Sequence, residues 1–159
     1  MKEWSNSVSD FTVVTLPKRR TAVARATLRT ADLAEFFGRA LPLVLSAMEA
    51  QGTLPAGEPF AYYRRIHAEN VEVETGFPIL GRFVASGEIE PGQLPACTAI
   101  SSVHVGALHT RPGTYARMVN WAVNNGLKPT GEMWEVHLVD PDREADPSRW
   151  LTELFLPVE

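Results

Sequence analysis

The sequence is poor in cysteine and lacks both long apolar runs and a basic stripe. Its one cysteine, Cys97, cannot form an internal disulfide, which indicates a reducing compartment. No stretch approaches the roughly 20 apolar residues that cross a membrane, and residues 1–6 do not resemble a signal peptide. We therefore expect a cytoplasmic protein without a membrane partner.

Charge and motifs exclude further classes. The net charge is −4, and the only basic cluster is Lys18-Arg19-Arg20, so we expect no direct nucleic-acid binding. GxGxxG and P-loop patterns are absent, and no two histidines have HExxH spacing. Ser101-Ser102 lacks a GxSxG context. We expect neither a cofactor nor a metal, and we interpret Cys97 as a small buried hydrophobe.

The chain contains an internal repeat. Residues 52–58 match residues 126–132, with Gly, Pro, Gly and Glu in register at a constant spacing of 74 positions. A second block, 74–79, matches 153–158. Because 159 residues suit one compact domain, we predict a single domain over 1–159. Its first copy spans about 11–80, a linker about 81–96, and its second copy about 97–159.

Periodicity predicts the same elements in each copy. In the first we expect a strand over 11–28, a helix that Asp32 and Glu35 cap and Gly52 ends, and strands over 60–66 and 69–77. That helix carries an apolar stripe, interrupted by Pro42, where we expect a kink. The stripe comprises Leu33, Phe36, Phe37, Ala40, Leu41, Val44, Leu45 and Met48.

In the second copy we expect a strand over 98–105 and a helix with Pro112 in its first turn and Asn125-Gly126 at its end. A strand over 133–139, a polar loop and a strand over 150–158 follow. The helix buries Tyr115, Met118, Val119, Ala122 and Val123. The fold class is therefore α+β, a mostly antiparallel sheet with two main helices.

The copies differ at one position, where the first has Ala61 and the second has Glu135. Side chains alternate along a strand, so Glu135 and His137 share one face, while Trp134, Val136 and Leu138 share the other. We expect the apolar face to pack on the helices, and the Glu135 face to meet solvent or to line a cavity between the copies. In an apolar, aromatic cavity, the carboxylate would act as a general acid or base, or hold a lipophilic cation.

Two aromatic residues complete the candidate ligand site. Tyr63 is the counterpart of His137 in the first copy, and Trp150 opens the closing strand. Our candidate ligand-binding residues are therefore Glu135, His137, Tyr63 and Trp150, with Glu135 also catalytic if the protein is an enzyme. For His137 the alternative is an ordinary half-buried histidine on a strand. For Glu135 the alternative is a solvated glutamate on a strand.

The order and spacing of these motifs resemble the GyrI-like domain, the effector-binding domain of AraC- and MerR-type regulators. The segments that carry the resemblance are 73–78, 126–131, 134–141 and 146–158. The resemblance implies two strand–helix–strand–strand units related by a pseudo-twofold, with a ligand cavity between them. It also implies that Glu135 is the site carboxylate and Trp150 a pocket wall, as in multidrug-binding members.

This sequence departs from the family pattern where His137 replaces the usual Tyr, and where Gly106-Ala107-Leu108 replaces Gly-Pro-Tyr. We expect no helix-turn-helix domain, because the two copies use nearly all of the chain.

Three functions fit the sequence. The first is a stand-alone binder of lipophilic, cationic or electrophilic compounds. The second is a hydrolase of cyclopropane-bearing genotoxins in which Glu135 directs water, and the third is an interaction module of the gyrase-inhibitor type.

Overall fold

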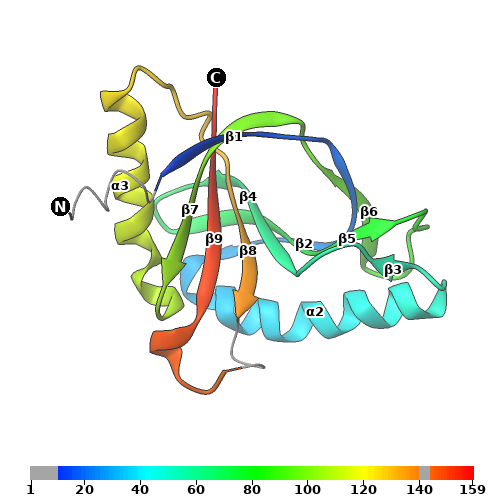
Figure 1. Cartoon of the computed structure of the whole chain (residues 1–159). Helices are drawn as coiled ribbons and strands as arrows, with labels where there is room; N and C mark the ends of the chain where they lie inside the picture. The colour runs from blue at the N-terminus through cyan, green and yellow to red at the C-terminus, as the bar shows by residue number, and fades with distance from the viewer. Residues whose placement is uncertain (1–10, 140–143) are drawn as a thin grey trace. The chain divides into compact units, whose positions relative to one another are not determined.

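The computed structural model describes residues 11–139 and 144–159. These residues form two α-helices and nine strands, and the strand pairs within each unit are antiparallel, which confirms the α+β class. The chain divides into two compact units (Figure 1). Unit 1 comprises the chain up to Leu16 together with 97–159, and unit 2 comprises 17–96. Neither of the two described helices has the length and apolar character needed to cross a bilayer.

Unit 2 is a sheet with one long helix. Its strands are β2 (Arg19–Arg29), β3 (Leu54–Pro55), β4 (Phe60–Ile66), β5 (Asn70–Leu80) and β6 (Ile89–Leu94). They pair in the order β4-β5-β2-β6, and β3 pairs with β5. Helix α2 (Leu33–Ala50) follows the short 3-10 turn η1 (Thr30–Asp32) and lies against β2 and β5 (Figure 1).

The stripe predicted for α2 is largely confirmed. Six of its members are buried, whereas Leu41 and Leu45 are only partly buried. Pro42 lies inside the helix, and Gly52 follows its end with a φ of 68°. The predicted capping box is wrong, because Asp32 makes no side-chain cap. The turn η1 gives Asp32 a φ of −95° and a ψ of 1°, which is not the extended backbone that a capping residue needs.

Two predicted segments need correction. The strand predicted over 11–28 is two strands, β1 (Thr12–Leu16) in unit 1 and β2 in unit 2, separated at Pro17, which has no N–H to donate. The segment 81–96, predicted as a linker, contains β6, which pairs with β2. Strand β6 includes Pro91, and proline is tolerated there because β6 has only one neighbour in the sheet of unit 2.

Unit 1 pairs β1 with three further strands in the order β1-β7-β9-β8. These are β7 (Cys97–Val105), β8 (Met133–Val139) and β9 (Leu151–Val158). Helix α3 (Arg111–Asn124) follows the turn η2 (Leu108–Thr110), and the turn η3 (Pro147–Arg149) precedes β9. The strands predicted over 98–105, 133–139 and 150–158 match β7, β8 and β9 to within one residue at each end. Part of the predicted polar loop, 140–143, lies outside the described residues.

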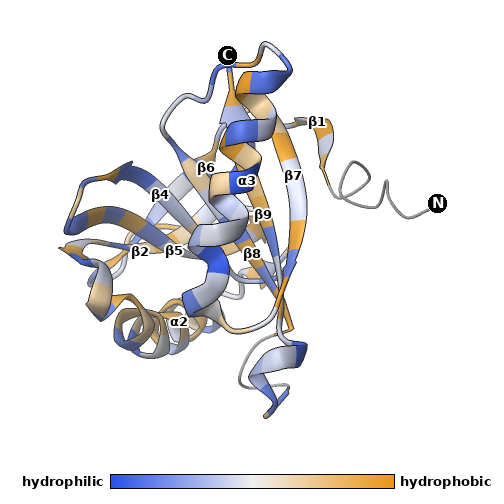
Figure 2. Cartoon of the chain, turned by 90° about the vertical axis from the view of Figure 1, so that its left-hand side faces the viewer, coloured by the Kyte–Doolittle hydropathy of each residue, from blue (hydrophilic) through white to orange (hydrophobic). Residues whose placement is uncertain are grey.

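The core of unit 1 lies between α3 and one face of its sheet. Figure 2 shows hydrophobic segments along β7 and β9. The buried residues of this core are Ile100, Met118, Ala122, Leu154, Leu156 and Val158. Val123, predicted to be buried, is instead 63% exposed. Each unit contains the predicted order of strand, helix, strand, strand, as β2, α2, β4 and β5 in unit 2 and as β7, α3, β8 and β9 in unit 1. Strands β3 and β6 in unit 2 and β1 in unit 1 are additional to that order.

Candidate functional site

Glu135 lies in the middle of β8 and its side chain is completely buried. Across the strand pair it stands opposite Leu154, which belongs to the core that Met118 of α3 joins. Directly opposed residues share a face of the sheet, so Glu135 faces α3. The alternative that Glu135 is a solvated strand glutamate is therefore wrong.

The prediction that the apolar face of β8 packs on the helix is also wrong for unit 1. Trp134 points to the opposite face, where its ring lies 5.4 Å from that of Phe155. Trp134 is only 3% exposed, so both faces of β8 are buried. Alternation shows which side chains share a face, but it identifies the face that a helix covers only when the other face is solvated.

Arg111 of α3 is the charged partner of Glu135. Its Nη1 forms an ion pair with Glu135 Oε1, and its side chain is 14% exposed. Arg111 is the first residue of α3, and its long side chain reaches Glu135 on β8. Arg111 could not be singled out from the sequence, because its position there marks only the start of a helix.

Tyr115 adds a phenol to the same carboxylate. Its hydroxyl donates to Glu135 Oε2 at 3.4 Å and lies 3.5 Å from the carbonyl oxygen of Trp134. Residues four apart in a helix lie on the same face, so Arg111 and Tyr115 reach the strand together. That four-residue spacing is the sequence signal that connects Tyr115 with Arg111, although Tyr115 was predicted only as part of the buried stripe of the helix.

His137 also contacts Glu135, which confirms that the two residues share a face of β8. His137 Nε2 lies 3.4 Å from Glu135 Oε1, and both side chains are buried. An ionised carboxylate can only accept, so this ring nitrogen carries the proton when the bond forms. The carboxylate thus has Arg111 and His137 at one oxygen and Tyr115 at the other.

A second histidine fixes the start of α3. Thr152 of β9 pairs with His137 on one side and with His104 of β7 on the other. The His104 ring reaches α3, with Nδ1 at 2.8 Å from Thr114 Oγ1 and Nε2 at 2.8 Å from Thr110 Oγ1. These hydrogen bonds hold Thr110 and Thr114, which lie on either side of Arg111 in the sequence, against β7. The buried polar groups therefore form one cluster where the helix starts.

Comparison with known proteins identifies the family. The model of the GyrI-like small-molecule-binding domain matches residues 9–159. The chain belongs to the GyrI-like family. A search of proteins with curated functions finds no match.

Solved structures share the GyrI-like fold. The C-terminal domain of EcmrR has a TM-score of 0.83 at 21% identity, covering 94% of this chain and 96% of that one. In an EcmrR–DNA complex the TM-score and identity are the same, but this chain spans only 57% of the EcmrR chain. A hydrolase encoded by lin2189 of Listeria innocua has a TM-score of 0.66 at 13% identity, with 94% and 92% covered.

A further GyrI-like structure contains a ligand. SAV2435, solved bound to tetraphenylphosphonium, has a TM-score of 0.65 at 10% identity, with 94% of this chain and 93% of that chain covered. At such identities the likeness shows a shared fold. What each relative binds is a property of that relative.

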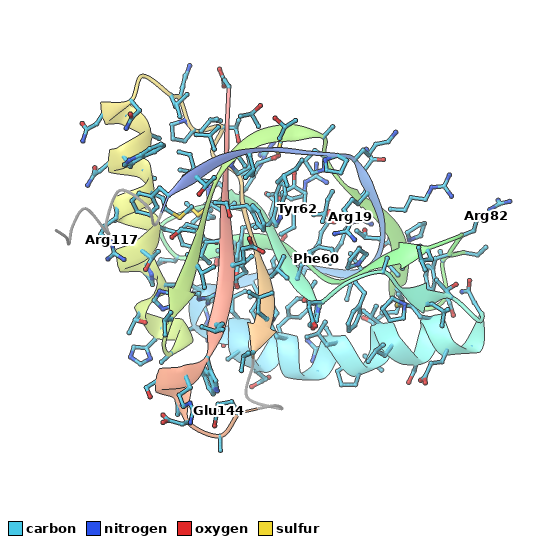
Figure 3. All side chains as sticks on the ribbon, in the orientation of Figure 1. Arg19, Phe60, Tyr62, Arg82, Arg117 and Glu144 are labelled. Atoms are coloured by element: carbon cyan, nitrogen blue, oxygen red, sulfur yellow. The ribbon has the colours of Figure 1, made fainter. Side chains whose placement is uncertain are left out.

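The other two predicted site residues of the GyrI-like chain, Tyr63 and Trp150, lie outside β8. Tyr63 is a buried residue of β4 in unit 2. The Trp150 indole donates to the carbonyl oxygen of Glu144 at 2.7 Å. Glu144 lies in the loop before β9 (Figure 3). Their place in a ligand pocket stays a prediction. Within residues 11–139 and 144–159, no three His, Cys, Asp or Glu side chains gather to hold a metal ion.

The cluster around Glu135 supports two kinds of chemistry. A carboxylate removed from water is costly unless it is paired, and Arg111 supplies that pairing. A buried charge acts on a ligand more strongly than a solvated one, because less water screens it. A phenol and an imidazole on the same carboxylate also provide hydrogen-bond donors beside any group that the carboxylate would act on.

Proposed function

We propose that this GyrI-like chain binds a lipophilic small molecule at Glu135, and that the carboxylate selects compounds with a positive or electrophilic centre. The observation that carries the proposal is the complete burial of Glu135 among polar partners in a small-molecule-binding family. A buried ion pair contributes little net stability compared with apolar residues of similar volume, so stability alone does not account for a carboxylate at this position.

The fold supports a lipophilic cation as the ligand class. SAV2435, which has the same fold, was solved with tetraphenylphosphonium, a cation whose charge is shielded by four phenyl rings. Such a cation is weakly hydrated, so it loses little on leaving water. Tyr115 adds an aromatic ring beside the carboxylate, and aromatic faces attract cations.

The test compares ligands that differ in charge but have similar shapes. Tetraphenylphosphonium, tetraphenylborate and neutral triphenylphosphine oxide are titrated into the wild type and into Glu135→Gln by isothermal calorimetry. Glutamine keeps the shape and removes the charge. We expect Glu135→Gln to weaken tetraphenylphosphonium binding by about 1.5–3 kcal/mol, the contribution of a contact to a charged group, and to leave the neutral compound nearly unchanged.

Glu153→Gln is the matched control. Glu153 lies on the neighbouring strand β9 opposite Val136, so it points to the other face of the sheet, where Ser101 Oγ lies 3.3 Å from it. This variant should bind all three probes as the wild type does. Equal tetraphenylphosphonium affinity in Glu135→Gln and the wild type would contradict the proposal.

One observation favours hydrolysis as a second candidate function. The Tyr115 hydroxyl contacts one oxygen of Glu135 and His137 the other, so a water directed by the carboxylate would have proton donors beside it. A cyclopropane-bearing alkylator is incubated with the protein and followed by mass spectrometry for the addition of one water. Turnover that Glu135→Gln and Tyr115→Phe both abolish would establish the enzyme, and absence of any hydrated product would refute it.

A further inference from the structure

We propose that Arg111 is an internal counter-ion of the site, and that a cationic ligand binds by displacing its guanidinium from Glu135. This inference rests on the proposed binding at Glu135 and adds how the site is regulated. It makes Arg111 a specificity-determining residue, because every cation must compete with it.

The competition follows from the occupancy of the carboxylate. Arg111 Nη1 is already paired with Oε1 of Glu135, the charge that a cationic ligand would use. Two positive charges on one buried carboxylate repel each other, and little water screens that repulsion. The ligand and the guanidinium therefore exclude each other from close contact with Glu135.

The position of Arg111 makes its release feasible. It is the first residue of α3, where the helix dipole places positive partial charge and disfavours a cation. The first turn has no acidic residue, and Thr110 makes no side-chain cap. The Arg111 side chain also retains 14% exposure, whereas Glu135 has none. The guanidinium thus has a route towards solvent that the carboxylate lacks.

The rest of the cluster stays in place during this exchange. Tyr115 contacts the other oxygen of Glu135, so the carboxylate keeps a partner on the helix. His104 holds Thr110 and Thr114, on either side of Arg111, against β7. The movement is therefore a rotation of the Arg111 side chain about a fixed helix start.

The exchange selects the ligand by hydration. A small cation such as potassium loses its water shell on entering and gains only what Arg111 already supplies. A bulky organic cation with delocalised or shielded charge loses little hydration and buries apolar surface as well. The ligand class is therefore a lipophilic monocation, and the resting site rejects inorganic cations.

The test removes the guanidinium. Arg111→Met keeps roughly the length of the side chain and removes its charge, and tetraphenylphosphonium is titrated at neutral and at mildly alkaline pH. We expect affinity to rise about tenfold or more, the size of one charge-assisted hydrogen bond. Arg117→Met is the control, because Arg117 projects from the same helix (Figure 3) and donates to Thr114 at 3.2 Å instead of Glu135.

A second measurement uses the wild type, so the outcome does not depend on the folding of the variant. The guanidinium Nε–H signal of Arg111 is assigned by nuclear magnetic resonance through its loss in Arg111→Lys. It should shift as tetraphenylphosphonium saturates the protein and stay unmoved by tetraphenylborate. An unmoved signal at saturation, or a folded Arg111→Met with unchanged affinity, overturns the inference.

The two proposals fail differently. If Glu135→Gln weakens tetraphenylphosphonium binding but neither Arg111 measurement responds, the site stands and the counter-ion role falls. If Glu135→Gln binds as the wild type does, the site itself is wrong. If Arg111→Met binds tetraphenylphosphonium and the wild type does not, both proposals are supported. If neither protein binds it, both proposals are overturned.

Discussion

The ion pair between Arg111 and Glu135 predicts a stability pattern that two separate contacts would not give. Arg111→Met leaves a carboxylate with 0% exposure beside an apolar side chain, and breaking a buried pair in this way costs about 3–5 kcal/mol. Glu135→Gln leaves the Arg111 guanidinium, whose side chain is 14% exposed, without its charged partner. The amide oxygen of the introduced glutamine can still accept a hydrogen bond from it. The cost of Glu135→Gln should be smaller, about 1–3 kcal/mol.

The combined variant decides whether the pair exists. Glu135→Gln should be destabilising in the wild type but stabilising in the Arg111→Met background, because there it removes an uncompensated buried charge. This reversal of sign does not depend on the size of either single effect. Against a total stability of about 5–15 kcal/mol, each change is large enough to measure.

Urea denaturation followed by tryptophan fluorescence is a suitable assay. Trp121, Trp134 and Trp150, the tryptophans that the structure describes, all belong to unit 1, so their emission reports on the unit that contains the pair. The slope of the transition checks that all variants expose similar surface on unfolding. If Glu135→Gln lowers the free energy of unfolding equally in both backgrounds, the two side chains act independently and the reasoning is refuted.

Three further predictions concern other positions. Burial, and then the carboxylate of Glu132, raise the pKa of the Cys97 thiol, so at mildly alkaline pH it should react with a disulfide reagent more slowly than a free cysteine, and Glu132→Gln should speed it up. Gly76→Ala should lower the melting temperature strongly, because a Cβ would lie 1.9 Å from the carbonyl oxygen of Ala22. Gly38→Ala, in the open space around α2, should raise stability by about 0.5–1 kcal/mol, and a melting temperature at or below that of the wild type would contradict this.

Local signals predicted most of the fold. The strands at 60–66 and 133–139 and the ends of both helices followed from alternation, apolar spacing and the Gly residues that end helices. Strand β6 could not be predicted in this way, because Pro91 and Gly92 within it disfavour a strand. It forms because β2, distant in sequence, offers a free edge for pairing.

The surroundings of Glu135 were predicted in part. The broken repeat pointed to Glu135, whose role as a site residue stays a prediction, and alternation correctly placed His137 beside it. The face that α3 covers depends on how the helix lies on the sheet, which is a tertiary property. For that reason Trp134 was predicted on the wrong face, and Arg111 and Tyr115 could not be connected with the carboxylate from the sequence. The pocket roles of Tyr63 and Trp150 stay predictions.

Strand β1 gives the chain a particular order of assembly. It is made early, but its partner β7 lies beyond the whole of unit 2, which is continuous in sequence. At a synthesis rate of roughly 5–20 residues per second, β1 therefore waits on the order of ten seconds for its partner, long enough for unit 2 to fold first. Until then β1 is an unpaired strand, and later it covers the edge of β7. Loss of β1 would leave that edge open to pairing with another chain.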